Sequence, residues 1–164
     1  MAVNRRLQSL LMLNRVEYEL LPHREAFTAQ EVAQTTHVRG RRLAKVVLVR
    51  TGRNRYLMAV LPASEHVDLE VLAHLSGHER LRLASEEEML RAFPDCEPGA
   101  IPPFGNLYDV PVFLDTCLTH EEDIIFQAGN HHEVVRMPFA EYERLAGPFA
   151  EVACLHRAGA ILTV

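Results

Sequence analysis

The sequence has few cysteines, a single lysine and no long apolar run. Its three cysteines, Cys96, Cys117 and Cys154, are far apart, and no C-x-x-C pair occurs. This spacing indicates neither a zinc knuckle nor a disulfide framework, so we expect a reducing, cytoplasmic environment. No apolar run approaches the ~20 residues that cross a bilayer. The apolar N-terminal stretch LQSLLMLNR is interrupted too soon for a signal peptide, so no membrane partner is expected.

Several familiar catalytic motifs are also missing. There is no serine nucleophile elbow, and none of the cysteines lies in a recognisable catalytic context. The loop rich in glycine and proline near position 100 is not followed by Gly-Lys-Ser/Thr, which excludes a P-loop. The candidate functional residues therefore lie outside these motifs.

Charge is unevenly distributed along a chain of ordinary composition. Hydrophobic residues make up 48% and charged residues 24% of the 164 positions, which is typical of one globular domain spanning 1–164. The net charge is −5, yet residues 1–55 contain 11 of the 17 basic residues and only 4 of the 22 acidic ones. This bias suits a phosphate-bearing ligand held at one side, and a solvated basic loop is an equal alternative.

Hydrophobic periodicity and capping signals predict a mixture of helices and strands. Helices are expected at 3–14, 28–34, 68–75, 85–93 and 138–146. Strands are expected at 16–21, 46–49, 55–61, 80–83, 111–115, 123–127 and 132–137, with a last one in the tail EVACLH…AILTV. The turns TGRN and Gly129-Asn130 predict two hairpins. Because no strict βαβ rhythm appears, the fold class is predicted to be α+β with a mixed sheet.

The stretch TAQEVAQTTHVRGRRLAKVVLVRTG, from Thr28 to Gly52, permits two interpretations. A DNA-reading helix-turn-helix would need a second helix after the turn. The β-branched residues of KVVLV favour a strand instead, so no DNA partner is expected. Lys45 then stands at the start of this strand. It is the sole lysine, whereas 16 arginines fill the other basic positions. This bias indicates a position that needs an amine or cannot fit a guanidinium. Chance placement of the one lysine is an equal alternative.

Two further motifs are candidates for chemistry. In GAIPPFG, from Gly99 to Gly105, prolines stiffen the loop and glycines allow close backbone approach. Such a loop holds a carboxylate, a phosphate or an oxyanion, or is simply a structural turn. In AGNHHE, His131 and His132 follow a turn, and on a strand they point to opposite faces, which weakens a His-His metal site. One of them binds substrate, or both are exposed hairpin residues.

In order and spacing, the motifs TAQEVA, LAKVVLV, GAIPPFG and AGNHH resemble the YbaK-like aminoacyl-tRNA deacylase family, relatives of the editing domain inserted in prolyl-tRNA synthetases. The resemblance runs from about Val16 to Leu145. It implies a mixed, partly barrel-like sheet flanked by helices. It also implies a cytoplasmic, trans-acting enzyme that hydrolyses the ester of mischarged tRNA without a metal or other cofactor. The implied partners are the acceptor end of mischarged tRNA and an aminoacyl-tRNA synthetase.

The resemblance also implies roles for single residues. The expected catalytic residues are Lys45, Gly105, Gly129 and His131. The expected substrate-binding residues are Gly99, Pro102, Phe104, Arg39, Arg41 and Arg42. Val46 is apolar where some family members have a polar residue, which leaves the identity of the removed amino acid open.

In the resulting hypothesis, the Lys45 ammonium binds the terminal phosphate or the ester oxygen through a charge-assisted hydrogen bond. Backbone N–H groups around Gly105 and Gly129 would stabilise the carbonyl oxygen, and His131 would orient the ribose hydroxyl or the water. Three alternatives remain: a non-catalytic module that binds tRNA or a synthetase, a DNA-binding regulator, and a metal hydrolase. The metal hydrolase would use His120, His131 and His132.

Overall fold

The computed structural model describes residues 3–157. Its α-helices within that range are α1 (Arg5–Leu13), α2 (Ala29–Thr36), α3 (Leu69–Ser76), α4 (Glu86–Ala92) and α5 (Phe139–Ala146). Its strands are β1 (Glu19–Pro22), β2 (Leu43–Thr51), β3 (Tyr56–Pro62), β4 (Leu81–Leu83), β5 (Val112–Asp115), β6 (Asp123–Gln127), β7 (Glu133–Pro138) and β8 (Glu151–Ala153). Two 3-10 helices, η1 (Gly105–Leu107) and η2 (Thr116–His120), flank β5. No described helix has the length and apolar character needed to cross a membrane.

The strands form one mixed sheet, as predicted. Their order is β1-β7-β6-β2-β3-β5-β8, and β4 pairs with β2 beside this path. The pairs β2–β6, β3–β5 and β5–β8 are parallel, whereas β1–β7, β6–β7, β2–β3 and β2–β4 are antiparallel. A mixed sheet with helices is therefore confirmed. Over residues 3–157 the sheet stays open, with β1 and β8 at its two ends, so it does not close into a barrel.

Local signals in the sequence produce the predicted elements. Thr28 and Glu31 form a capping box at the start of α2, and Ser85 and Glu88 form a second one at α4. The β2–β3 hairpin turns where TGRN was expected. The structure corrects one expectation, because β1 begins only at Glu19. The strand expected in the tail is present as β8 at Glu151–Ala153, while AILTV lies outside the described residues.

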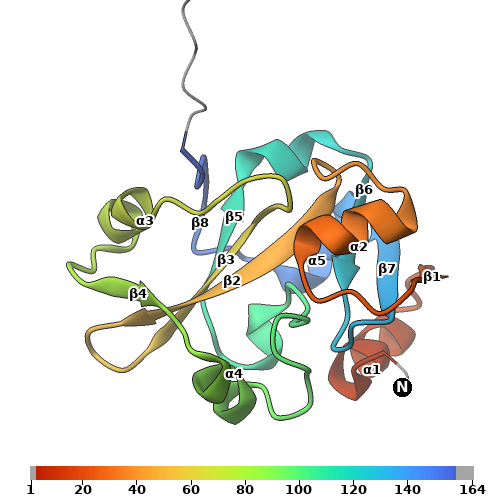
Figure 1. The fold of residues 1–164 in the computed structure, drawn as a ribbon, viewed down its shortest axis with the longest axis horizontal. Coiled ribbons are helices and arrows are strands. Elements are labelled where there is room, and N and C mark those ends of the chain that lie inside the picture. Colours follow the sequence, from red (N-terminus) through yellow and green to blue (C-terminus); the bar gives the residue numbers. More distant parts are fainter. Residues whose placement is uncertain (1–2, 158–164) are drawn as a thin grey trace, which may run out of the picture.

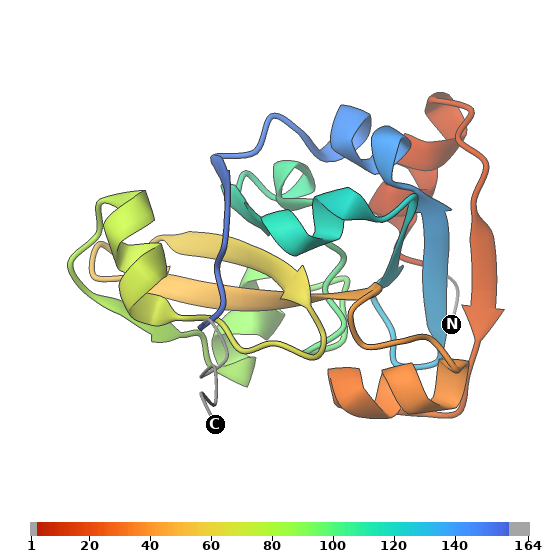
Figure 2. The ribbon, with the colours of Figure 1, turned by 90° about the horizontal axis from the view of Figure 1, so that it is seen from above.

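Helices cover the sheet on both faces (Figures 1 and 2). The main face carries the large core, where alternate residues of β2 such as Ala44 and Leu48 pack with α1, α5 and the segment before β5. The second face carries two smaller clusters. One gathers around α3 and includes Val49 and Leu72, and the other gathers around α2 and includes Val32 and Leu43. The second face is therefore covered in two patches rather than continuously.

Candidate active site

Lys45 lies on the second face between the two small clusters. Side chains alternate along β2, so Lys45 shares its face with Leu43 of the α2 cluster and Val47 of the α3 cluster. Figure 1 shows α3 and α2 toward opposite ends of the β2–β3 hairpin. Lys45 thus stands where neither helix cluster extends, and Val46 points to the opposite face and packs against the main core.

The surroundings of the Lys45 amine disfavour its charged form. Its side chain is half-buried, and this burial lowers the pKa below the ordinary 10.5, while the nearby carboxylate of Glu65 acts in the opposite direction. Within residues 3–157, no carboxylate lies within 4.0 Å of the Lys45 amine. A half-buried ammonium without an ion pair is best stabilised by an anionic ligand.

His131 is a buried connector between two loops. Only 4% of its surface is exposed. One ring nitrogen, Nε2, lies 2.8 Å from the carbonyl oxygen of Pro98, and Nδ1 lies 3.3 Å from the Gln127 amide nitrogen. The backbone N–H of His131 donates to Glu97 at 3.0 Å. Both ring nitrogens therefore have protein partners, and the geometry gives His131 a positioning role. His132 is exposed, so His131 is the histidine of this pair that faces inward.

The glycine-proline loop and the β6–β7 turn form one hydrogen-bonded unit. The Gly129 N–H donates to Ala100 at 2.7 Å, and its carbonyl oxygen accepts from Glu97 at 2.9 Å. Gly129 has φ +103°, and a Cβ there would lie 3.1 Å from the Asn4 Cβ. Gly99 has φ +82°, beside the His131 ring. Among the hydrogen bonds of the described chain, the Gly99 N–H has no acceptor, and Gly99 is exposed.

The parallel pairing of β2 with β6 brings Lys45 to this unit. Leu43 is level with Ile125 and Ala44 with Phe126. Continuing this register by one residue places Lys45 level with Gln127, which holds the His131 ring. Ile125 belongs to the α2 cluster, so alternation puts Gln127 on the second face as well. Residues from three sequence motifs therefore converge at one place on the second face.

The structure shows packing or hydrogen-bonding roles for three expected site residues, and the expected catalytic role of the Gly105 N–H stays a prediction. Phe104 is fully buried in the main core, edge-on to Phe126 and Tyr142, so its ring does not face a substrate. Gly105 packs so tightly that a Cβ would collide with the Val110 carbonyl oxygen, and this crowding accounts for the glycine. The Gly129 N–H is already donated to Ala100 and is not free for an oxyanion. Local sequence could not show the contacts of Phe104 and Gly129, because their partners lie on other segments.

Pro102 shapes the same loop from inside. It is buried, and its carbonyl oxygen accepts a hydrogen bond from the Phe104 N–H at 2.8 Å. The neighbouring Pro103 carbonyl accepts from the Tyr142 hydroxyl at 2.9 Å. These bonds fix the loop to the main core, so that Gly99 is presented at its exposed end.

The basic residues divide into separate groups. Arg39 and Arg42 line a cavity of about 560 Å³ together with His37 and Arg136. Arg41 lines a smaller cavity of about 260 Å³ with Glu65 and Cys117. Arg50 lies near the far end of strand β2, eight residues or roughly 26 Å beyond Arg42, and Arg53 and Arg55 lie in the turn that follows. The basic run that is continuous in sequence is therefore not one surface.

Two alternatives lose their structural basis. The helix-turn-helix would need a helix where β2 runs, so the structure lacks the second helix of that motif. The metal hydrolase would need His120, His131 and His132 together. In the described part of the chain, the residues grouped at metal-ligand spacing are Asp115, Cys117 and His156.

Sequence analysis missed four neighbours of the site. Gln127 and Glu97 hold His131, and Glu65 acts on the Lys45 amine. Phe27 is 64% exposed, and its ring centroid lies 5.0 Å from that of His131. Gln127 directly precedes AGNHH, and Glu97 lies two residues before GAIPPFG. This closeness is the one signal that could have indicated them. Glu65 and Phe27 have no such signal.

Comparison with known proteins identifies the family. Residues 23–145 match the family model of the aminoacyl-tRNA editing domain. The chain belongs to this family. It is 30% identical over 152 residues to the multifunctional Ser/Thr-tRNA deacylase ProXp-y of Escherichia coli strain K12, covering 88% of this chain and 89% of that protein. The Lys45 site thus lies in an aminoacyl-tRNA editing domain.

Two further relatives agree with this assignment. A candidate Cys-tRNA(Pro)/Cys-tRNA(Cys) deacylase, EbsC, of Enterococcus faecalis is 25% identical over 137 residues, 83% of each chain. A crystal structure described as that of a candidate trans-editing enzyme for prolyl-tRNA synthetase superposes with a TM-score of 0.78 at 24% identity, covering 94% of this chain and 97% of that one. This structural likeness shows that the editing-domain fold is shared.

Proposed function

We propose that this editing domain is a trans-acting aminoacyl-tRNA deacylase, which hydrolyses the ester of mischarged tRNA in the cytoplasm. The observation that carries the proposal is the half-buried Lys45 amine on the exposed part of the second face, next to the unit that contains Gly99 and His131. Membership of the aminoacyl-tRNA editing domain family supports the same reaction.

Seryl and threonyl esters are the first proposed substrates. The relative at 30% identity is named a Ser/Thr-tRNA deacylase, and it is covered over 89% of its length. Cysteinyl esters are the next, because EbsC is described by that activity. All three amino acids are small and polar, which suits a site bordered by polar groups such as Gln127 and Glu65. Prolyl-tRNA synthetase, named in the related crystal structure, is the proposed synthetase partner.

In the proposed mechanism, a water molecule attacks the ester carbonyl carbon. The Lys45 ammonium and the exposed Gly99 N–H stabilise the negative charge that develops on oxygen, and the ribose oxygen leaves with a proton. Each such donor typically contributes about 3–4 kcal/mol of transition-state stabilisation. His131 keeps the two loops in register through Pro98 and Gln127. The substrate's own hydroxyl or amine assists proton transfer to and from the water.

The acceptor stem is proposed to approach over α2. Arg39, Arg42 and Arg136 line the cavity on that side of Lys45, and guanidinium groups suit phosphate oxygens. Phe27, exposed beside His131, offers a flat surface on which a terminal base stacks.

A deacylation screen tests the proposal. Purified protein is incubated with tRNA charged with serine, threonine, cysteine or alanine on non-cognate carriers, and the loss of ester is followed against buffer alone. We expect turnover of at least seryl- or threonyl-tRNA. Intact tRNA binding without turnover of any substrate would contradict the proposal and select the non-catalytic module.

A further inference from the structure

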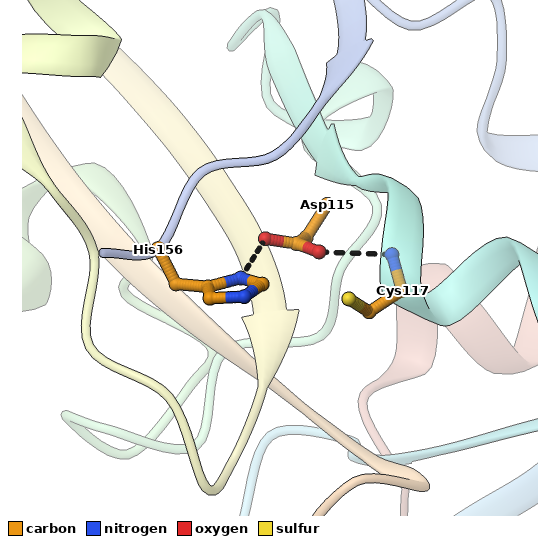
Figure 3. Close-up of side chains that lie close together, drawn as sticks. All are labelled: Asp115, Cys117 and His156. Atoms are coloured by element: carbon orange, nitrogen blue, oxygen red, sulfur yellow. Dashed lines mark hydrogen bonds and ion pairs between the residues drawn. The ribbon is translucent and has the colours of Figure 1, made fainter. Parts of the chain in front are cut away.

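Asp115, at the end of β5, is a fully buried carboxylate that organises the segment after β8. Parallel pairing sets it level with Ala153 of β8. One oxygen accepts the Cys117 N–H at 2.9 Å, and the other accepts the Leu155 N–H at 2.9 Å and lies 2.7 Å from His156 Nδ1. Figure 3 shows the carboxylate between the imidazole and the Cys117 backbone, with the Cys117 sulfur directed toward the ring.

This arrangement prepares His156 to bind a metal. Its Nδ1–H is donated to Asp115, which leaves Nε2 as the nitrogen with a free lone pair. Imidazoles that bind metals almost always donate their other N–H to a carboxylate or carbonyl in this way, which fixes the tautomer and orients the ring. His156 is 14% exposed, so solvent ions can reach it.

Two thiols lie next to the same ring. Cys117 offers its sulfur within 4.8 Å of ligand atoms of both Asp115 and His156. The Cys154 sulfur lies 3.8 Å from each ring nitrogen of His156. A tetrahedral zinc ion with ordinary bond lengths sets a sulfur and a nitrogen about 3.6 Å apart. The two separations from the Cys154 sulfur approach this value. Cys154 does not belong with Cys117 to a group whose ligand atoms all lie within 4.8 Å, so the exposed Cys117 and Cys154 side chains must turn toward each other to share an ion.

The types of ligand also favour a zinc-class cation, because thiolate sulfur and imidazole nitrogen are the groups that zinc binds in proteins. A bound ion would deprotonate the thiols that it holds.

We propose that Cys117, Cys154 and His156 bind a zinc-class divalent cation, with both sulfurs and Nε2 as ligands and water in the fourth position. Asp115 acts as a positioning residue behind the imidazole. Binding releases the two thiol protons to solvent, so no oxidant or reductant is needed. The ion would join η2 to the segment after β8 and stabilise this end of the sheet, independently of the Lys45 site.

The site escaped sequence analysis because its two halves are far apart. Each half is a pair of residues with one residue between them, Asp115 with Cys117 and Cys154 with His156, and the two pairs are far apart in the sequence. Only the parallel β5–β8 pairing brings them together. The spacing of the cysteines predicted no zinc knuckle, and this site is not one.

Cobalt and zinc titrations of the full chain test the site. After reduction and removal of metal with a chelator, we expect one Co²⁺ per chain with thiolate-to-cobalt charge-transfer absorption, and a rise in melting temperature on adding Zn²⁺. Cys117→Ser and His156→Gln should weaken Co²⁺ binding by more than about 100-fold. His120→Gln, in the same 3-10 helix as Cys117 but outside the cluster, is the matched control and should bind normally.

Three outcomes would overturn the proposal. One is an unchanged aqueous Co²⁺ spectrum, together with no effect of Zn²⁺ on the melting temperature of the unmutated protein. The second is binding that survives both substitutions equally. The third is a Cys117–Cys154 disulfide in the purified protein with no metal binding after its reduction, which would assign the two cysteines to a redox pair. The zinc effect on the unmutated protein needs no variant, so misfolding of a variant would not obscure the result.

Discussion

At the scale of single residues, the site depends on where one amine is placed. The sequence singled out Lys45 because arginine fills all other basic positions. It could not show that burial lowers the pKa of this amine, because that burial depends on how segments distant in sequence pack around β2. The same limit applies to Phe104, whose aromatic partners lie on β6 and α5 and bury its ring in the main core.

The sole lysine permits a direct measurement of its own titration. With ¹³C-labelled lysine, NMR should show a single side-chain amine signal that titrates below the ordinary 10.5, because burial disfavours the charged form. Adding a non-hydrolysable aminoacyl-adenosine phosphate should raise the midpoint, since an anion stabilises the ammonium. A midpoint at or above 10.5 in the free protein would contradict the half-buried environment.

At the scale of elements, local signals specified helices and hairpins but not the parallel pairs. The capping boxes at Thr28 and Ser85 and the TGRN turn act within a few residues, so they were readable. The β2–β6 and β5–β8 pairs join strands that are far apart in sequence, and no local turn or cap indicates that they pair. These two pairs create the Lys45 site and the proposed metal site, so neither geometry could be predicted from the sequence.

Gly129→Ala should lower the unfolding free energy more than the same substitution at another glycine with positive φ. At φ +103° a Cβ is strained and would also meet Asn4, so we expect a loss of about 1–3 kcal/mol in unfolding free energy and slower deacylation. Gly77→Ala is the control, because Gly77 also has positive φ but has open space around its Cβ position. Chemical denaturation of both variants compares them. Equal losses would show that crowding at Gly129 is unimportant.

The α4–β2 connection should make the fold sensitive to acid. Arg82, the Ser85 N–H and Arg50 surround the Glu88 carboxylate and hold its pKa well below the ordinary 4.5. A depressed carboxylate pKa stabilises the fold above the unfolded value, and this stability is lost as pH falls below 4.5. Melting temperatures of the unmutated protein and Glu88→Gln should therefore converge below that pH. A constant difference at all pH values would contradict this role.

At the scale of the whole molecule, the basic N-terminal third is distributed over distant parts of the surface. The sequence predicted a phosphate ligand from a run of seven basic residues between 39 and 55. Strand β2 separates that run into two ends, and Arg50 is paired with Glu88. Charge counting along the chain could not show this separation, because it depends on the extended strand.

The divided basic surface predicts unequal contributions to tRNA binding. Arg39→Ala with Arg42→Ala should weaken tRNA binding and reduce the slope of log affinity against log salt by roughly 1.4–1.8, as two lost phosphate contacts require. Arg53→Ala with Arg55→Ala removes the same charge at the far end of β2 and should change neither value. Filter binding across a salt series compares the pairs. Equal effects would indicate general electrostatic attraction rather than a path over α2.

Single-turnover deacylation by Lys45 variants tests the central claim most directly. With seryl- or threonyl-tRNA in the presence of excess enzyme, Lys45→Ala and Lys45→Arg should each slow ester hydrolysis by at least about 100-fold, since a charge-stabilising donor is lost or misplaced. Circular dichroism should show unchanged folding, and Arg15→Ala, an exposed cation outside the site, should be fully active. Unmutated rates in both Lys45 variants would contradict the account.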